Sequence, residues 1–235
     1  MRLASGKEVR YNNAMIWNLS SLLSDPLSVL RQLMYVIPVI LISLTLHEWG
    51  HAYAAYRCGD PTARNLGRMT LNPIAHIDPI GFLSLLLLGF GWAKPVPVNS
   101  RNFRNYRVGE AVVSLAGVAM NFLLVVLTSI VFIILGRTYP KAFFNDALMS
   151  ILSYFLSLNV TLMVFNLLPI YPLDGYHIFE LLFARILPAK LFFFLRRYGN
   201  IILIVLLVAG NRFGFSPITI VQNWVASVIT FFIGL

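Results

Sequence analysis

The sequence predicts an all-α polytopic membrane protein with about five to six transmembrane helices. Of its 235 residues, 58% are hydrophobic and only 11% are charged, whereas a soluble domain needs a more polar surface. Several apolar runs approach the length of about 20 residues that a helix needs to cross a bilayer. The Lys and Arg residues gather in short loops between these runs, as they do in cytoplasmic loops.

Composition also limits the partners and the organisation of the chain. The formal net charge of +9 does not indicate nucleic acid, because the basic residues flank apolar runs; the lipid bilayer is the expected partner. Cys58 is the only cysteine, which excludes an internal disulfide and a thiolate cluster. We expect an N-terminal polar or interfacial segment (1–30), a membrane-embedded core (31–190) and a C-terminal transmembrane hairpin (191–235).

The expected spans are apolar runs bounded by charged or turn-forming residues: 33–56, 108–135, 148–168, 198–211 and 214–235. Asp25-Pro26 interrupts the earlier apolar stretch 14–30. That stretch is predicted to form an interfacial helix, and a further crossing by it is left open.

Residues 82–98 predict a short re-entrant or extended segment. Its first part, 82–90, is apolar but too short to cross the bilayer. Its end, Lys94-Pro95-Val96-Pro97-Val98, alternates with proline and therefore favours extended backbone. Such a segment can bind an extended peptide by strand addition, so Val96 and Val98 are candidate substrate-binding residues.

The motif His47-Glu48-Trp49-Gly50-His51 closes the first expected span. Residues i and i+4 of a helix share one face, so His47 and His51 can bind one metal ion. H-E-x-x-H is the zincin pattern, in which Glu48 would be the general base toward a zinc-activated water. Ionisable side chains at membrane depth are costly without partners. The motif therefore predicts one Zn²⁺ per chain.

A hydrolytic zinc site needs a third protein ligand. The candidates are His76, Asp174, His177 and Glu180. Topology favours Asp174. Residues 57–107 hold seven Lys or Arg, against two in 137–141, so the first set is predicted to be cytoplasmic. The span 148–168 then returns to that side and brings Asp174 toward His51.

Four further polar residues are candidates for supporting roles. His76 and His177 could hydrogen-bond a ligand of the metal. Asn121 and Asn166 lie at membrane depth and could bind an extended substrate or the oxyanion of the intermediate. Hydrogen bonding between helices is the alternative for both asparagines, and the small residues around Gly117 also indicate a helix-packing face.

These motifs together resemble the site-2 protease family of intramembrane zinc metalloproteases, in its short prokaryotic form without a PDZ domain. The matching segments are H-E-W-G-H at 47–51, G-W-A-K-P-V-P-V-N at 91–99, A-G-V-A-M-N at 116–121 and N-L-L-P-I-Y-P-L-D-G at 166–175. The resemblance covers roughly residues 33–190. Val118 departs from it, since the family usually has Pro after the Gly.

The resemblance implies zinc held by His47, His51 and Asp174, with Glu48 as catalytic base. It also implies that Asn166 and Asn121 lie near the substrate. The expected reaction is the cleavage of membrane-protein substrates within or near a transmembrane helix, close to the cytoplasmic face of a prokaryotic plasma membrane.

A zinc-binding transporter or channel using the same ligands is the alternative function. It gives Glu48 no role, and it would need polar residues lining both halves of the bilayer. A purely structural zinc site is the third option, and the buried glutamate beside the ligands argues against it. The residues leave the physiological substrate and the oligomeric state open.

Overall fold

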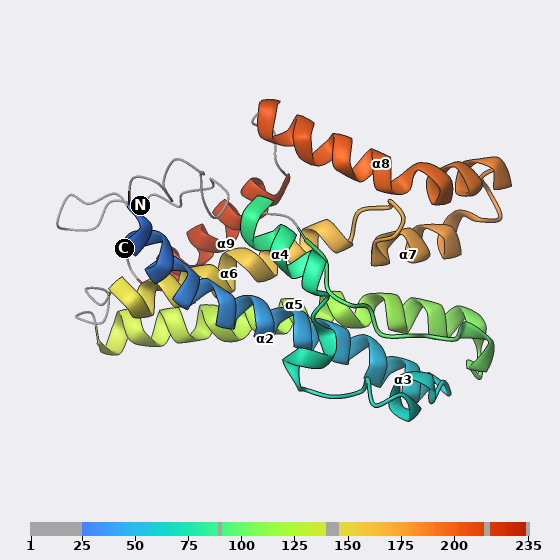
Figure 1. The fold of residues 1–235 in the computed structure, drawn as a ribbon, viewed down its shortest axis with the longest axis horizontal. Helices are drawn as coiled ribbons and strands as arrows, with labels where there is room; N and C mark the ends of the chain where they lie inside the picture. Colours follow the sequence, from blue (N-terminus) through green and yellow to red (C-terminus); the bar gives the residue numbers. More distant parts are fainter. Residues whose placement is uncertain (1–24, 89–90, 140–145, 214–216, 234–235) are drawn as a thin grey trace. The chain divides into compact units, whose positions relative to one another are not determined.

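A computed structural model describes residues 25–88, 91–139, 146–213 and 217–233, and shows helices joined by loops (Figure 1). The α-helices are α2 (Pro26–Cys58), α3 (Thr62–Asn65), α4 (Pro79–Leu88), α5 (Tyr106–Thr138), α6 (Asp146–Asn166), α7 (Asp174–Phe183), α8 (Ala189–Phe213) and α9 (Pro217–Ile233). Two 3-10 helices, η1 (Pro73–His76) and η2 (Ser100–Asn102), lie in the loops. Among these residues the only β pairing is an isolated bridge between Ile77 and Ala93. The predicted all-α class is confirmed.

Within the described part of the chain, three helices are long and apolar enough to cross a membrane: Pro26–Cys58, Tyr106–Thr138 and Ala147–Asn166. They correspond to three of the predicted spans. The expected span 198–211 lies within α8, and the described part of the expected span 214–235 forms α9. Both spans stay predictions, as does a total of five to six.

Helix α2 begins earlier than the predicted span. The backbone N–H of Ser28 donates to Asp25 Oδ1 at 3.1 Å, and Pro26 occupies the first helical position. Both are helix-start signals, so this part of the expected interfacial segment 14–30 is the first turn of α2. Residues 14–24 lie outside the described part of the chain.

The chain divides into two compact units. One comprises the described residues up to Met34 together with Ile77–Lys94, and the other comprises Tyr35–His76 and Pro95–Leu235. In the first unit, the carboxylate of Asp78 caps α4 by accepting the N–H of Gly81 at 2.8 Å. The first part of the expected re-entrant or extended segment is thus helical, and residues 91–99 contain no helix.

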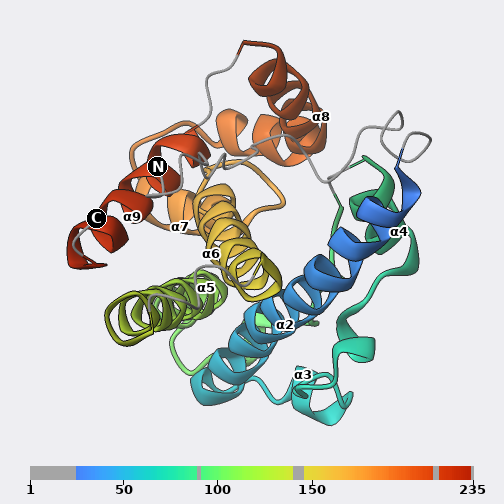
Figure 2. The same ribbon diagram turned by 90° about the vertical axis from the view of Figure 1, so that its left-hand side faces the viewer.

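Helices α5 and α6 run side by side in the second unit, and α9 packs against both (Figures 1 and 2). Their buried contacts come from Val125, Phe132, Leu156, Val160, Val225 and Ile229. The outer face of α5 instead exposes large apolar side chains, including Phe122 and Ile134. An apolar exterior on a buried polar interior is the arrangement that a lipid environment favours.

Small residues let α2 approach α5 closely. A Cβ at Gly50 would lie 2.7 Å from Met120 Cγ and 3.0 Å from the Ala116 carbonyl oxygen. Ala54 and Ala55 continue this contact by packing on Val113. The same face of α2 carries the two histidines of the 47–51 motif, so close packing brings them against α5.

A tight turn after α6 returns the chain to α2. Gly175, in the first turn of α7, would bring a Cβ into the backbone of Leu167 and Leu168, so the start of α7 is held directly on the end of α6. Arg196 of α8 holds the other end of α7 through the Glu180 carboxylate, with Nη2 to Oε2 at 2.7 Å. Glu180 is thereby paired, and it does not join the metal ligands.

Candidate metal centre

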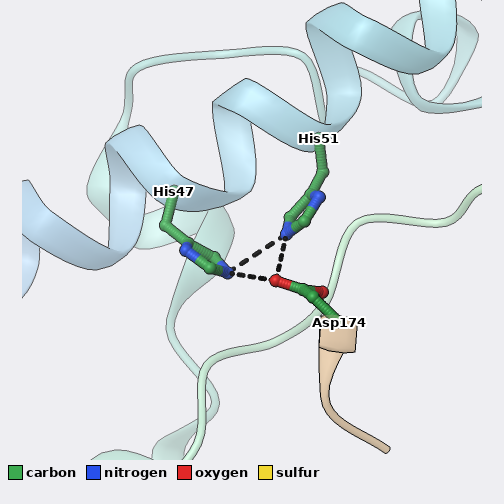
Figure 3. Close-up of side chains that lie close together, drawn as sticks. All are labelled: His47, His51 and Asp174. Carbon is green, nitrogen blue, oxygen red and sulfur yellow. Dashed lines mark hydrogen bonds and ion pairs between the residues drawn. The ribbon is translucent and has the colours of Figure 1, made fainter. Parts of the chain in front are cut away.

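His47 and His51 lie one turn apart on α2 and point toward the same spot (Figure 3). Both are buried, with 6% and 8% exposure, and their Nε2 atoms are 3.1 Å apart. The i, i+4 spacing of the motif therefore places the two imidazoles side by side on one face of α2, as predicted from the sequence.

The other ring nitrogen of each histidine has a partner on α5. His51 Nδ1 lies 2.7 Å from the Val113 carbonyl oxygen, and His47 Nδ1 lies 2.6 Å from Asn121 Oδ1. A carbonyl oxygen can only accept, so His51 carries its proton on Nδ1 and its Nε2 has a free lone pair. This tautomer is the one that binds a metal through Nε2.

Asp174 completes a three-atom group. Its Oδ2 lies 3.5 Å from His47 Nε2 and 3.3 Å from His51 Nε2. This oxygen is buried and has no hydrogen-bond partner among the described residues, although a buried carboxylate oxygen normally has one. With the Nδ1 protons directed to α5, the Nε2 atoms of the two neutral imidazoles present lone pairs to the carboxylate oxygen. Three lone pairs at this separation repel one another unless a cation lies between them.

The spacing of the three atoms fits zinc. Tetrahedral bonds of about 2.0–2.1 Å place neighbouring ligand atoms about 3.3–3.4 Å apart, and the three distances are 3.1, 3.3 and 3.5 Å. Among the described residues, this is the group of His, Cys, Asp or Glu side chains placed to hold a metal ion. Asp174, the third ligand that topology favoured, belongs to this candidate group.

Gly117 provides the space for this group. A Cβ at this position of α5 would collide with the Nε2 atoms of His47 and His51. The sequence indicated a packing glycine here. The structure shows that its missing side chain makes room for the ligand nitrogens.

Glu48 is held by the segment that follows residue 91. It is buried, with 8% exposure, and its Oε2 accepts the backbone N–H of Val96 at 2.8 Å. The Val96 side chain packs against Ala52 and Ala63, whereas that of Val98 is 37% exposed. Val96 thus orients the predicted base, a contact that the sequence did not reveal.

Asp60 fastens the same segment further along. Its carboxylate accepts the backbone N–H of Asn99 and the side-chain amide of Asn102, both at 2.7 Å, and the hydroxyl of Thr62. Burial alone would raise the pKa of Asp60, but these hydrogen bonds outweigh it and lower the pKa below the ordinary 3.8. In the sequence, Asp60-Pro61 indicated only a loop.

The other predicted residues lie apart from the three ligand atoms. His76 is buried and donates through Nε2 to the Thr70 carbonyl at 2.9 Å. His177 follows Asp174 by three residues on α7, with Nδ1 at 4.0 Å from Glu110 Oε2. Supporting roles for these two histidines stay predictions.

Both predicted asparagines make hydrogen bonds. Asn166 donates to the Leu162 carbonyl of its own helix at 3.0 Å, and Asn121 contacts His47 and Asn159. Their predicted contact with substrate stays a prediction. The sequence did not single out Asn159, although a polar residue inside an apolar span is the same signal that marked Asn121 and Asn166.

Comparisons with known proteins agree with this centre. The family model "Peptidase family M50" matches residues 135–210. "Putative zinc metalloprotease YwhC" of Bacillus subtilis is 41% identical over 186 residues, which cover 78% of this chain and 83% of the relative. "Putative zinc metalloprotease Rip2" of Mycolicibacterium smegmatis is 35% identical over 206 residues, which cover 81% of this chain and 74% of the relative. No solved structure matches.

Proposed function

Because this chain belongs to peptidase family M50, and is a zinc metalloprotease of the site-2 protease type, we propose that it cleaves membrane proteins within or near their transmembrane helices. The observation that carries this proposal is the buried group of His47, His51 and Asp174 on membrane-spanning α2 and at the start of α7. A hydrolytic centre at this depth serves a substrate that is itself in the bilayer.

Each residue of the centre has a defined role in the proposal. His47, His51 and Asp174 would hold one zinc ion per chain, and that ion would supply Lewis-acid chemistry toward the scissile carbonyl and a water molecule. Glu48 is the general base that takes a proton from that water and passes it to the leaving amine. The N–H of Val96 occupies Oε2 of Glu48, so Oε1 is the oxygen that carries the proton.

The substrate must be extended where it is cut, because peptide groups in an intact helix are already hydrogen-bonded. We propose that the exposed edge near Val98 receives it. Pro95 and Pro97 have no N–H, the Val96 N–H is bound to Glu48, and the Pro95 carbonyl accepts from Arg68 at 3.2 Å. A substrate strand would therefore be held at Pro97 and Val98. A photocrosslinker at Val98 that never captures substrate would count against this edge.

The charge of the loops supports a cytoplasmic position for the centre. Basic residues are concentrated between Arg57 and Arg107, next to the end of α2 that carries His51. The host membrane is then a prokaryotic plasma membrane, in keeping with bacterial relatives.

Metal analysis of the purified protein tests the centre directly. We expect about one zinc per chain in the unmodified protein and in His76→Ala, which removes a buried histidine outside the group. Asp174→Ala should lose most of the zinc, since two ligands remain. Equal zinc contents in Asp174→Ala and His76→Ala would overturn the assignment of the third ligand.

A further inference from the structure

A chain of buried hydrogen bonds leads away from the metal centre. His47 Nδ1 is 2.6 Å from Asn121 Oδ1, and Asn121 Nδ2 donates to Asn159 Oδ1 at 2.8 Å. Asn159 Nδ2 then donates to Ser43 Oγ at 2.9 Å and to the Phe155 carbonyl at 2.8 Å. Ser43 and both asparagines have 0% exposure. The chain runs from α2 through α5 to α6 and back to α2.

The direction of these bonds is set at Phe155. Its oxygen is a carbonyl and can only accept, so the amide group of Asn159 that faces it must be the NH₂. The Asn159 oxygen then faces Asn121, which must present its own NH₂. As a result, Asn121 turns its oxygen toward His47.

This order decides where His47 carries its proton. Asn121 Oδ1 is an acceptor, so Nδ1 of His47 must be the donor, and Nε2 keeps its lone pair for the metal. If the side-chain amide of Asn121 were flipped, its NH₂ would face Nδ1 of His47. The His47 proton would then be on Nε2, where it would block metal coordination. His51 needs no such chain, because its Nδ1 donates directly to the Val113 carbonyl.

We propose that Asn159 is a positioning residue for the metal centre: through Asn121, it holds His47 in the tautomer that binds metal. Asn159 has no contact with the metal ligands themselves. The inference rests on the proposed function only in that the centre holds zinc. It assigns a role to a buried amide that would otherwise serve only to join α5 to α6.

A substitution of Ser43 distinguishes a directional role of this hydrogen-bond network from a purely structural one. It bonds to the same amide nitrogen as Phe155 does, so Ser43→Ala removes one buried hydrogen bond of the network while Phe155 still fixes the direction. Asn159→Leu removes the acceptor that faces Asn121 and leaves the Asn121 amide free to turn over. A purely structural network would suffer from both substitutions, whereas a directional one suffers mainly from Asn159→Leu.

The experiment measures Zn²⁺ affinity by chelator competition on the full-length protein in detergent, with circular dichroism to confirm folding. Loss of a residue that orients a ligating histidine lowers metal affinity by about 10- to 100-fold, and we expect this for Asn159→Leu. Ser43→Ala should stay within about threefold of the unmodified protein, because the outer-shell partner of His47 is kept. Nitrogen-15 NMR of His47 in the metal-free protein should show Nδ1–H in the unmodified protein and a mixture of tautomers in Asn159→Leu.

A double-mutant cycle provides the second test. If Asn159 acts through Asn121, the double variant Asn121→Leu/Asn159→Leu binds zinc no more weakly than Asn121→Leu alone, because the two residues form one path. Additive losses would overturn the proposal. So would equal losses in Asn159→Leu and Ser43→Ala.

Asn159→Asp keeps the proposal testable if the leucine variant does not fold. A neutral carboxylic acid has the shape of the amide, accepts from Asn121 and donates to the Phe155 carbonyl, so zinc affinity should stay within about threefold. A tenfold loss of zinc affinity in a folded Asn159→Asp protein would contradict the proposal that Asn159 orients His47 through Asn121. Failure of the unmodified protein to bind zinc is a different result, which would overturn the proposed function instead.

Discussion

Gly117 shows how a single missing side chain shapes the centre. It binds nothing, yet any Cβ there would meet the Nε2 atoms of both histidines. Because α5 is a rigid helix packed on α2 and α6, it cannot move aside without disturbing the interior of the bundle.

We therefore expect Gly117→Ala to lower zinc affinity at least about tenfold although no ligand is changed, as displacement of ligand orientation does. Gly136→Ala, in the last turns of the same helix, is the control. Alanine is the better helix former by about 1 kcal/mol, so neither variant loses helix stability for local reasons. Chelator competition gives the two affinities, and unchanged binding in Gly117→Ala would contradict the close approach of α5.

At the scale of residues, the sequence could predict the ligands but not their surroundings. His47, Glu48 and His51 follow one another at helical spacing, so local periodicity is enough to place them. Asp174 could be predicted from the sidedness of the spans, because the span 148–168 returns the chain to the side of His51. Asn159 joins α6 to α5, and no local pattern reports a contact between residues so far apart in the chain.

At the scale of elements, the segment from Pro95 to Asn102 is held at two points. Val96 donates to Glu48 and Asn99 donates to Asp60, so the start of this segment is fixed beside the predicted base. The carboxylate of Asp60 is buried and lies beyond the end of α2. It orders the loop through hydrogen bonds to a charged acceptor, which are stronger than neutral ones.

The depressed pKa of Asp60 makes this contribution depend on pH. A carboxyl group whose pKa is lowered by folding stabilises the fold above its unfolded value and loses that effect as pH falls through the folded value. We expect Asp60→Asn to lower the free energy of unfolding by about 2 kcal/mol at pH 7. The difference from the unmodified protein should persist to pH 5 and shrink only below the ordinary value of 3.8.

Unfolding in detergent at several pH values measures this difference. Asp78→Asn serves as the control, because its carboxylate caps α4 and accepts the Gly81 N–H instead. A difference between the unmodified protein and Asp60→Asn that disappears already near pH 6 would show that the hydrogen bonds do not lower the pKa of Asp60.

The sequence described this region only in part. Repeated prolines predicted extended backbone in this segment, and residues 91–99 contain no helix. Helix α4 (Pro79–Leu88) was expected only as a short apolar segment, because ten apolar residues do not show whether they are a helix or a strand. The role of Asp60 depends on Asn99 and Asn102, which come close to it only after folding.

At the scale of the whole molecule, α5 (Tyr106–Thr138) decides the sidedness of the chain. Among the described residues, it is one of three helices long and apolar enough to cross a membrane, and a crossing would place its two ends on opposite sides. Arg101 precedes it and Tyr139 follows it, and both are exposed. Loop charge predicts that Arg101 lies on the cytoplasmic side.

We expect single cysteines at these positions to label from opposite sides when Cys58 is first replaced by serine. In intact cells, a membrane-impermeant maleimide should modify Tyr139→Cys at once. It should reach Arg101→Cys only after the cells are permeabilised, because loop charge predicts a cytoplasmic position for that loop. The reverse pattern would invert the topology and place the metal centre near the outer face.

Hydropathy and loop charge predicted the membrane class and three of the spans, because lipid imposes a length and a polarity on every crossing helix. The boundaries were less accurate: α2 begins at Pro26 and not near residue 33. Packing of α9 on α5 and α6 was not predictable, since apolar helices look alike in composition whichever neighbours they choose.

The central claim is that Glu48 is the base of a zinc-dependent peptide hydrolase, and the Glu48→Gln variant tests it most directly. The measurement follows cleavage of a membrane-protein substrate by the purified protein in proteoliposomes, together with zinc content. Glutamine keeps the shape of the side chain and can still accept the Val96 N–H, but it cannot take a proton from water. We predict full zinc content with cleavage lowered by at least about 100-fold. Cleavage at the unmodified rate by a zinc-loaded Glu48→Gln protein would contradict the account.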